Sequence, residues 1–375
     1  MPLLPDVLII GGGAIGLSTA YFLAKEQIRV QIVDKGEFGQ ESSWAGAGII
    51  PSGNGEHAQT DLEQLLAQSV RKFPSLSAEL RELTGIDNGY LVCGGLELIE
   101  TEISEQSNEW RSHAVEYQWL DAQAVRKIEP ELTPEIGGGY HLPEMAQVRN
   151  PRHIQALVAA CKLMGVDFQS GCEARGFEMS VRRISAVRTD RGDLTAGKFL
   201  ISAGAWTDKL LDQVGWRPGV HPVRGQIVML NTSRPLFRHI ILHGPRYLVP
   251  RVDGRLLIGS TEEHAGFEKQ TTAVAVADLI RFACSLVPAL QQAPVERCWA
   301  GLRPGTADGL PYMGAVPGID NLYVSAGHFR SGIQLSPGTG EVMKELLLGQ
   351  KLSLPIADFR TDRPGTRAPT SAFRS

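Results

Sequence analysis

Three glycines close to the start of the chain constrain its fold more than any other feature. Gly11, Gly13 and Gly16 follow the apolar run 7–10 and open an amphipathic helical pattern, and Asp34 closes the next apolar run. Gly11 allows a tight turn, Gly13 lets the backbone approach a pyrophosphate, and Gly16 lets the helix pack on the strand. An acid at this spacing holds a ribose hydroxyl, so the sequence predicts a bound dinucleotide.

Composition indicates a globular protein that acts on small molecules. The 375 residues suffice for two domains, and 43% hydrophobic with 21% charged residues is ordinary for a folded chain. The net charge is -4 and no block of Lys and Arg is present, so we expect no nucleic-acid partner. No apolar run approaches the length of about eighteen residues that a membrane helix needs, so we expect no membrane span and no signal peptide.

The cysteines and histidines show none of the spacings of a metal site. Cys93, Cys161, Cys172, Cys284 and Cys298 are far apart and odd in number, which argues against a disulfide framework or a zinc site. We therefore expect no metal and a reducing, cytoplasmic location.

Signals for the cofactor fold recur at the start, middle and end of the chain, with strand-rich segments between them. We expect an α/β fold in which a discontinuous Rossmann-like domain carries an inserted α+β domain with an antiparallel sheet for the substrate. The predicted cofactor domain comprises 1–87, 146–218 and 299–364, the substrate domain comprises 88–145 and 219–298, and 365–375 form a flexible tail.

Local signals place several elements within these domains. A helix is predicted over 60–83 with Gly85 as its stop, and another from an Asn150 cap to Met164. Asp253-Gly254 predicts a hairpin turn, and a helix is predicted over about 338–348, after Pro337.

Four further strings accompany the glycine turn: 42–50 (SSWAGAGII), 203–206 (AGAW), 299–306 (WAGLRPGT) and 327–333 (GHFRSGI). Together they resemble the D-amino-acid oxidase superfamily of flavoproteins over about residues 5 to 360, and within it the members that oxidise glycine. The resemblance implies FAD as the cofactor, a discontinuous FAD-binding domain and an antiparallel-sheet substrate domain.

The resemblance also implies which residues hold FAD. Ala14 and Ile15 would meet the pyrophosphate, Asp34 the ribose and Ala174 the adenine, while 47–49 and 328–334 would border the flavin ring. The full set is Gly11, Gly13, Ala14, Ile15, Gly16, Asp34, Lys35, Ser42, Ser43, Ala47, Gly48, Ile49, Ala174, His328, Phe329, Arg330, Ser331, Gly332, Ile333 and Gln334. We expect this FAD to be noncovalent, because Cys298 is better explained as a small packing thiol than as an attachment point.

For the substrate, the same resemblance selects Arg303, Tyr247 and Arg330 as the residues that bind and orient it. A guanidinium meets a carboxylate with two parallel N–H donors, so Arg303 would hold an amino acid over the flavin, with Tyr247 as its hydrogen-bonding partner. Arg330 would line the site or serve the flavin. Glu262 stands where some relatives have an apolar residue, and it either enters the site and disfavours acidic substrates or faces solvent.

The expected activity is oxidative deamination of glycine, a small D-amino acid or sarcosine, giving an oxo acid, ammonia or an amine, and hydrogen peroxide from molecular oxygen. By resemblance the protein would be a homo-oligomer, a tetramer, and would supply the glycine-derived imine from which the thiazole ring of thiamine is built. The alternatives are a D-amino-acid dehydrogenase with a quinone acceptor, a flavin-dependent tRNA-modifying oxidase, and a non-catalytic dinucleotide-binding protein.

Overall fold

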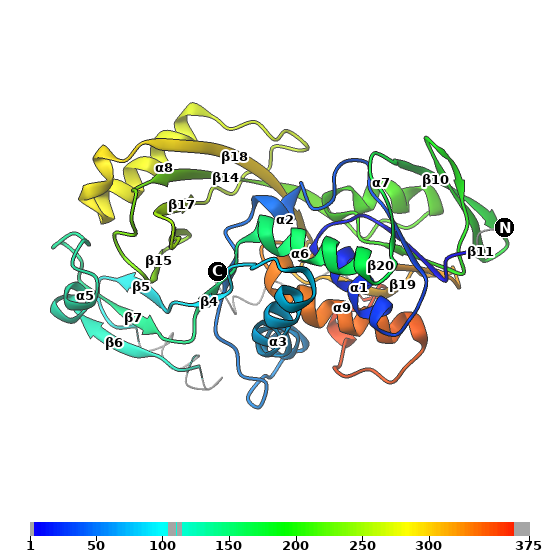
Figure 1. Cartoon of the computed structure of the whole chain (residues 1–375), viewed down its shortest axis with the longest axis horizontal. Helices are drawn as coiled ribbons and strands as arrows, with labels where there is room; N and C mark the ends of the chain where they lie inside the picture. Colours follow the sequence, from blue (N-terminus) through cyan, green and yellow to red (C-terminus); the bar gives the residue numbers. More distant parts are fainter. Residues whose placement is uncertain (1–3, 104–109, 111–114, 364–375) are drawn as a thin grey trace.

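The structure, a computed structural model, describes residues 4–103, 110 and 115–363, so the predicted tail 365–375 lies outside the described residues. Two large sheets lie side by side along the long axis of the molecule. The six-stranded sheet is on the right of Figure 1 and the eight-stranded sheet on the left. The predicted fold class, α/β with a Rossmann-like sheet and an added antiparallel sheet, is confirmed.

The six-stranded sheet contains the strands on either side of the glycine turn. Its order is β19-β20-β13-β1-β2-β9, and all neighbours are parallel except β19 and β20. The strands are β1 (Val7–Ile10), β2 (Val30–Val33), β9 (Asp167–Gln169), β13 (Lys198–Ile201), β19 (Tyr312–Ala315) and β20 (Leu322–Ala326). Parallel strands bring their carboxyl ends to one edge, so the segments that follow β1, β2, β13 and β20 meet there.

Both faces of this sheet are covered, which explains why its strands are continuous apolar runs. Side chains alternate between faces along a strand, so Ile9 packs with helices on one face, and Leu8 and Ile10 pack against a small antiparallel sheet on the other. The helices are α1 (Ala14–Lys25), α3 (Asp61–Thr84), α6 (Asn150–Leu163) and α9 (Gly332–Leu348). The small sheet consists of β10 (Ala174–Ser180), β11 (Arg183–Thr189) and β12 (Gly192–Leu194).

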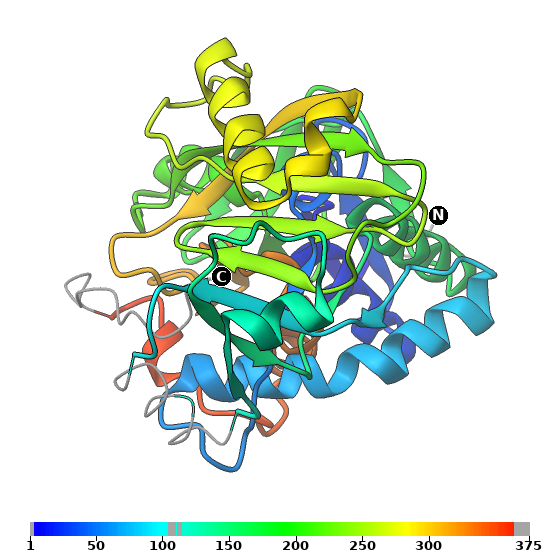
Figure 2. The same cartoon turned by 90° about the vertical axis from the view of Figure 1, so that its left-hand side faces the viewer.

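The eight-stranded sheet has the order β18-β14-β17-β16-β15-β5-β7-β6 and is antiparallel except between β15 and β5. Its strands are β5 (Gly95–Ile99), β6 (Gln118–Asp121), β7 (Gly138–Leu142), β14 (His221–Asn231), β15 (Ile240–His243), β16 (Arg246–Pro250), β17 (Arg255–Gly259) and β18 (Val295–Gly305). Helix α8 (Ala273–Leu286) covers one face, as Figure 2 shows, and α5 (Ala122–Ile128) packs there too. The long strands β14 and β18 extend toward the six-stranded sheet (Figure 1).

The remaining elements are short. A three-stranded antiparallel sheet has the order β3-β8-β4. The short elements are α2 (Ser42–Ala45), β3 (Ile49–Ile50), β4 (Leu91–Val92), β8 (Ala146–Gln147), α7 (Thr207–Leu211), and the 3₁₀ helices η1 (Gly204–Trp206), η2 (Asp212–Val214), η3 (Pro288–Gln292) and η4 (Ala357–Phe359).

Two local predictions are confirmed: the helix that ends at Gly85 and the hairpin turn at Gly254. Thr60 and Glu63 form a reciprocal capping box at the start of α3, and Gly85 ends the helix in the left-handed conformation, with φ of 73°. The turn at Gly254, with φ of 83°, joins β16 and β17 in the predicted hairpin.

The predicted start of the last long helix was wrong. Helix α9 begins at Gly332, and Pro337 lies inside it instead of before it. Proline has no N–H for the carbonyl of Ile333, but the Ser336 hydroxyl donates to that carbonyl at 2.8 Å. The earlier start brings the helix N-terminus directly after the string 327–331, at the edge where the parallel strands end.

The division of the chain into cofactor and substrate domains at the predicted boundaries stays a prediction. Within residues 4–103, 110 and 115–363, no helix combines the length and the apolar character needed to cross a bilayer. The same residues contain no group of three or more His, Cys, Asp or Glu side chains placed to share a metal ion.

Candidate functional site

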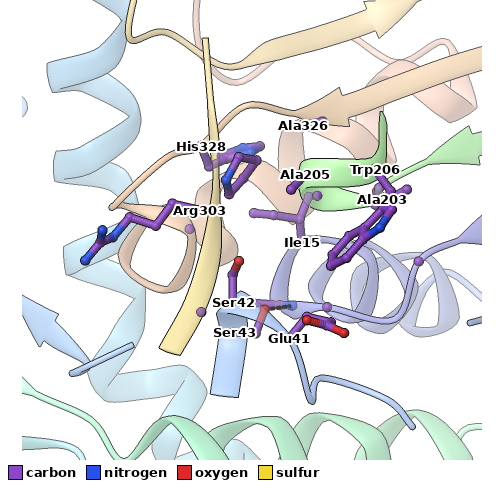
Figure 3. A pocket seen from close by; sticks show the side chains of 18 of the residues that line it. Ile15, Glu41, Ser42, Ser43, Ala203, Ala205, Trp206, Arg303, Ala326 and His328 are labelled. Atoms are coloured by element: carbon purple, nitrogen blue, oxygen red, sulfur yellow. Dashed lines mark hydrogen bonds between the residues drawn. The ribbon is translucent and has the colours of Figure 1, made fainter. Parts of the chain in front are cut away.

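A cavity of about 470 Å³ lies where the carboxyl ends of the parallel strands face the eight-stranded sheet. One wall consists of segments that follow β1, β2, β13 and β20, and the other of residues from β14, β16 and β18. Figure 3 shows Arg303 at one side of this cavity and Trp206 at the opposite side, with Ser42 and Ser43 between them. The cavity therefore has two ends, which differ in their charged groups.

Most of the predicted site residues line this one cavity. Of the predicted cofactor and substrate residues, only Gly16 and Ser331 fall outside the lining. Gly16 has a packing role, because a Cβ there would lie 2.1 Å from the Gly11 carbonyl oxygen. Ser331 is the residue before α9, and its side chain makes no capping hydrogen bond to that helix.

The glycine turn leaves its backbone open to the cavity. Gly11 has φ of 110°, and a Cβ there would lie 2.4 Å from the carbonyl oxygen of Ser202, so another residue would not fit. Helix α1 begins three residues later, and Ala14 N–H donates to the Ser43 hydroxyl at 2.9 Å. The N-terminus of α1, which carries partial positive charge, thus faces the cavity with the Ser43 hydroxyl beside it. This arrangement suits a pyrophosphate.

Asp34 lies at the end of the cavity away from Arg303. Its carboxylate accepts hydrogen bonds from Gly12 N–H at 2.8 Å and Gly36 N–H at 2.9 Å, and burial raises its pKa. The backbone bonds fix the carboxylate in place, so it can present an oxygen to a ribose hydroxyl. Beside it, the Lys35 ammonium stands 3.4 Å from the centre of the Trp206 ring.

Asn150 was missed as a site residue, because its position before Pro151 predicts a helix cap. The structure contradicts the cap: Asn150 is the first residue of α6, and its Nδ2 donates to the Ser43 carbonyl at 2.9 Å. Its buried Oδ1 has no partner within the described part of the chain. Gly48, with φ of 72°, packs so closely that a Cβ would lie 2.4 Å from this oxygen. A buried oxygen in the wall of the cavity is available to a ligand N–H or O–H.

The opposite end of the cavity is basic. The Arg303 guanidinium donates from Nη2 to Ser260 Oγ at 2.7 Å and from Nη1 to the Thr261 carbonyl at 3.1 Å. Both partners are neutral, and no carboxylate of the described residues pairs with Arg303, whose pKa is lowered by burial. The nearby Tyr247 is buried, which raises its pKa, so its hydroxyl keeps its proton.

Two glycines that the sequence did not single out make room for these side chains. A Cβ on Gly225 would lie 2.3 Å from both terminal nitrogens of Arg303, and one on Gly259 would lie 2.3 Å from the Tyr247 hydroxyl. Gly225 belongs to β14, which pairs with β18, and Gly259 pairs with Tyr247 across β17 and β16. Neighbouring strands thus leave space for the two polar groups.

Arg330 and His328 come from the string before α9. Arg330 lines the cavity and donates to Glu262, whose side chain is 40% exposed and stands outside the lining. Glu262 therefore neither enters the cavity nor points freely to solvent: it pairs with a cation of the cavity wall. His328 is buried beside Thr339 Oγ1, at 3.2 Å from Nε2, and burial lowers its pKa to about 3, so it is neutral at physiological pH.

Cys298 lies on β18 but outside the cavity lining, among apolar residues on the α8 side of the eight-stranded sheet. The residues around the cavity fit a flavin dinucleotide without a covalent bond to Cys298. They provide a glycine turn at a helix N-terminus, a fixed carboxylate, an amide oxygen that no described residue bonds, and a long wall of small residues.

The chain is similar to known flavin-dependent oxidoreductases over nearly its whole length. The family model for FAD dependent oxidoreductases matches residues 6–346. Glycine oxidase of Pseudomonas putida is 36% identical over 355 residues, covering 94% of this chain and 96% of that protein. The crystal structure of glycine oxidase from Geobacillus kaustophilus superimposes with a TM-score of 0.90 at 34% identity, covering 96% of this chain and 99% of that one. The bifunctional protein ThiO/ThiG of Synechocystis sp. is 35% identical over 96% of this chain but only 54% of its own length.

Acid precipitation tests the expected noncovalent attachment. Because Cys298 lies outside the cavity lining, the yellow chromophore should pass into the supernatant when the purified protein is precipitated. A Cys298→Ser variant should carry the same amount of flavin as the original protein. Colour that stays in the pellet of the original protein, and is lost from that of the variant, would contradict the expectation.

Proposed function

The chain belongs to the FAD-dependent oxidoreductase family, with FAD as its cofactor, and from that premise we propose that it oxidises the amine of glycine and of similarly small amino acids. Relatives named glycine oxidase, matching nearly the whole chain, support this substrate. The two-electron oxidation gives an imine, and its hydrolysis gives the oxo acid and ammonia, or an amine from sarcosine.

The observation that carries the proposal is the charge of Arg303. A half-buried guanidinium that has only neutral hydrogen-bond partners among the described residues carries a free-energy cost until an anion pairs with it. Arg303 lines the cavity, so a ligand can supply that anion. The carboxylate that every amino acid carries matches the planar fork of donors.

The chain's own residues can orient the substrate for this reaction. Arg303 fixes the carboxylate, and the protonated Tyr247 hydroxyl can donate a second hydrogen bond to it, which leaves the α-carbon with one orientation. FAD, when bound, supplies the acceptor for hydride. His328 is neutral and buried, so we assign it a packing role and no proton transfer. The N-terminus of α9 faces the cavity at Gly332 to Gln334 and favours negative charge there.

The proposal extends to the electron acceptor, the metabolic role, the location and the oligomeric state. We propose molecular oxygen as the acceptor and hydrogen peroxide as the product, because relatives that match nearly the whole chain are named oxidases. The bifunctional Synechocystis relative supports a role in forming the thiazole ring of thiamine. A cytoplasmic location agrees with five cysteines that are free in the structure. A homo-oligomer, as a tetramer, rests on the family resemblance.

Replacing Arg303 tests the carboxylate clamp. Arg303→Ala should cost about 2 to 5 kcal/mol of transition-state stabilisation in kcat/KM for glycine, the range for losing one member of a buried charge pair. Arg303→Lys should recover only part of the loss, because an ammonium cannot make the two parallel bonds. FAD content should stay unchanged in both variants. The control is Arg297→Ala, on the same strand but outside the cavity lining. Near-normal efficiency of Arg303→Ala would remove Arg303 from the proposal.

Glu262 should set the preference for substrate charge. Its carboxylate pairs with Arg330, so Arg303 is the cation available for a single substrate carboxylate. Glu262→Gln should remove the negative charge beside Arg330 and raise the kcat/KM ratio of D-aspartate to D-alanine about fivefold, the effect of about 1 kcal/mol for a partly exposed pair. Glu268→Gln, an exposed change in the same loop, is the control. An unchanged ratio in Glu262→Gln would show that this ion pair has no role in selectivity.

A further inference from the structure

Arg251 is a buried cation that the proposed reaction does not use. It follows β16 and is 6% exposed, and its guanidinium makes three hydrogen bonds. Nη1 donates to Gln147 Oε1 at 2.6 Å and to the Val148 carbonyl at 3.2 Å, and Nη2 donates to the Ala47 carbonyl at 2.7 Å. All three acceptors are neutral, so the charge itself is not paired by any of them.

The three acceptors belong to the segments that hold one wall of the cavity. Ala47 lies in that wall, together with Gly48 and Ile49. Val148 N–H donates to the Gly48 carbonyl at 2.8 Å, and Ile49 pairs with Gln147 between β3 and β8. A Cβ on Gly48 would lie 2.0 Å from the Val148 carbonyl oxygen, so the two segments touch closely. Arg251 donates hydrogen bonds to both segments and therefore holds the wall 47–49 against the segment 147–148.

The nearby carboxylate does not neutralise Arg251. Asp253 pairs instead with Arg149 at 2.6 Å and with Arg255 at 3.0 Å. Burial lowers the pKa of Arg251 to about 10, which still leaves it charged at neutral pH. A neutral amide side chain could donate to the same carbonyls without the cost of a buried charge. The positive charge is therefore a feature to be explained separately from the hydrogen bonds.

We propose that Arg251 is a positioning residue for the flavin. Its guanidinium fixes the wall 47–49, and its positive charge, which lies behind the Ala47 carbonyl, favours the reduced cofactor. Reduction of a bound flavin by two electrons adds negative charge to its ring, and a fixed buried cation stabilises added negative charge. The inference rests on the proposed placement of the flavin ring against Ala47, Gly48 and Ile49. It does not depend on which amino acid is oxidised.

Two variants separate the hydrogen bonds of the Arg251 guanidinium from its positive charge. Arg251→Gln removes the charge and keeps an amide donor, whereas Arg251→Lys keeps the charge and loses the planar fork. Arg255→Gln is the matched control, since Arg255 is a nearby cation paired with Asp253 and Glu296 at the surface. For each purified protein, the midpoint potential of bound FAD is measured by anaerobic titration against a reference dye. The dissociation constant of FAD is measured with the apoprotein.

Arg251→Gln should shift the equilibrium between reduced and oxidised flavin at least tenfold toward the oxidised form, which corresponds to about 30 mV for a two-electron couple. Arg251→Lys should keep the potential within that margin of the original protein but bind FAD about tenfold more weakly. The control should change neither quantity. A potential that is unchanged in Arg251→Gln overturns the role of the charge.

The Lys variant keeps the inference open to refutation if Arg251→Gln does not fold. An Arg251→Lys protein that binds FAD as tightly as the original overturns the role of the guanidinium in fixing the wall. Failure of the proposed function gives a different result: an original protein that binds FAD and is not reduced by glycine refutes the substrate and leaves the comparison of potentials intact. An original protein that binds no FAD refutes the cofactor placement on which the inference rests.

Discussion

The cavity at the junction of the two sheets is the constraint on which the rest of the structure depends. Protein interiors pack closely, and space lined by side chains without partners destabilises a fold until a ligand fills it. The segments around this cavity keep it open with backbone and small residues, as at Gly11, Gly48 and Gly225. Larger side chains would meet neighbouring backbone or the Arg303 guanidinium at less than 3 Å.

The electrostatics of the cavity change along its length. Asp34 and the start of α1 occupy one end, where they suit ribose and pyrophosphate, and Arg303 occupies the other with Arg330. Arg330 is paired with Glu262, whereas Arg303 has neutral partners among the described residues. The two arginines therefore differ in their surroundings: Arg303 faces the cavity without an anionic partner among the described residues, whereas the charge of Arg330 is already balanced by a carboxylate.

Sequence patterns predicted the parts of the site that depend on local spacing. The glycine turn and Asp34 were predicted from spacing, because their order in the chain reflects local geometry, whereas Arg303 and Arg330 were selected through the family resemblance of the strings that contain them. Asn150 was missed because a local rule gives it a cap, whereas its contact is with Ser43, far away in the chain. Gly225 was also missed because its role depends on a contact far away in the chain: it leaves space for the Arg303 side chain of the neighbouring strand.

The start of α9 and the pairing of Glu262 also depend on contacts that spacing does not encode. The rule that proline precedes a helix does not include a hydroxyl that compensates the missing N–H, as Ser336 does. Glu262 and Arg330 come together because the loop after β17 lies beside the segment before α9. The two alternatives for Glu262, inside the site or in solvent, did not include this third arrangement.

The most direct test of the account is an anaerobic titration of the purified, FAD-containing protein with glycine, followed by its visible flavin absorption. We expect glycine, sarcosine and D-alanine each to bleach the flavin. Admitting oxygen should restore the colour and produce hydrogen peroxide. A flavin that dithionite reduces but none of these three amines can bleach would contradict the central claim that the cavity binds and oxidises small amino acids.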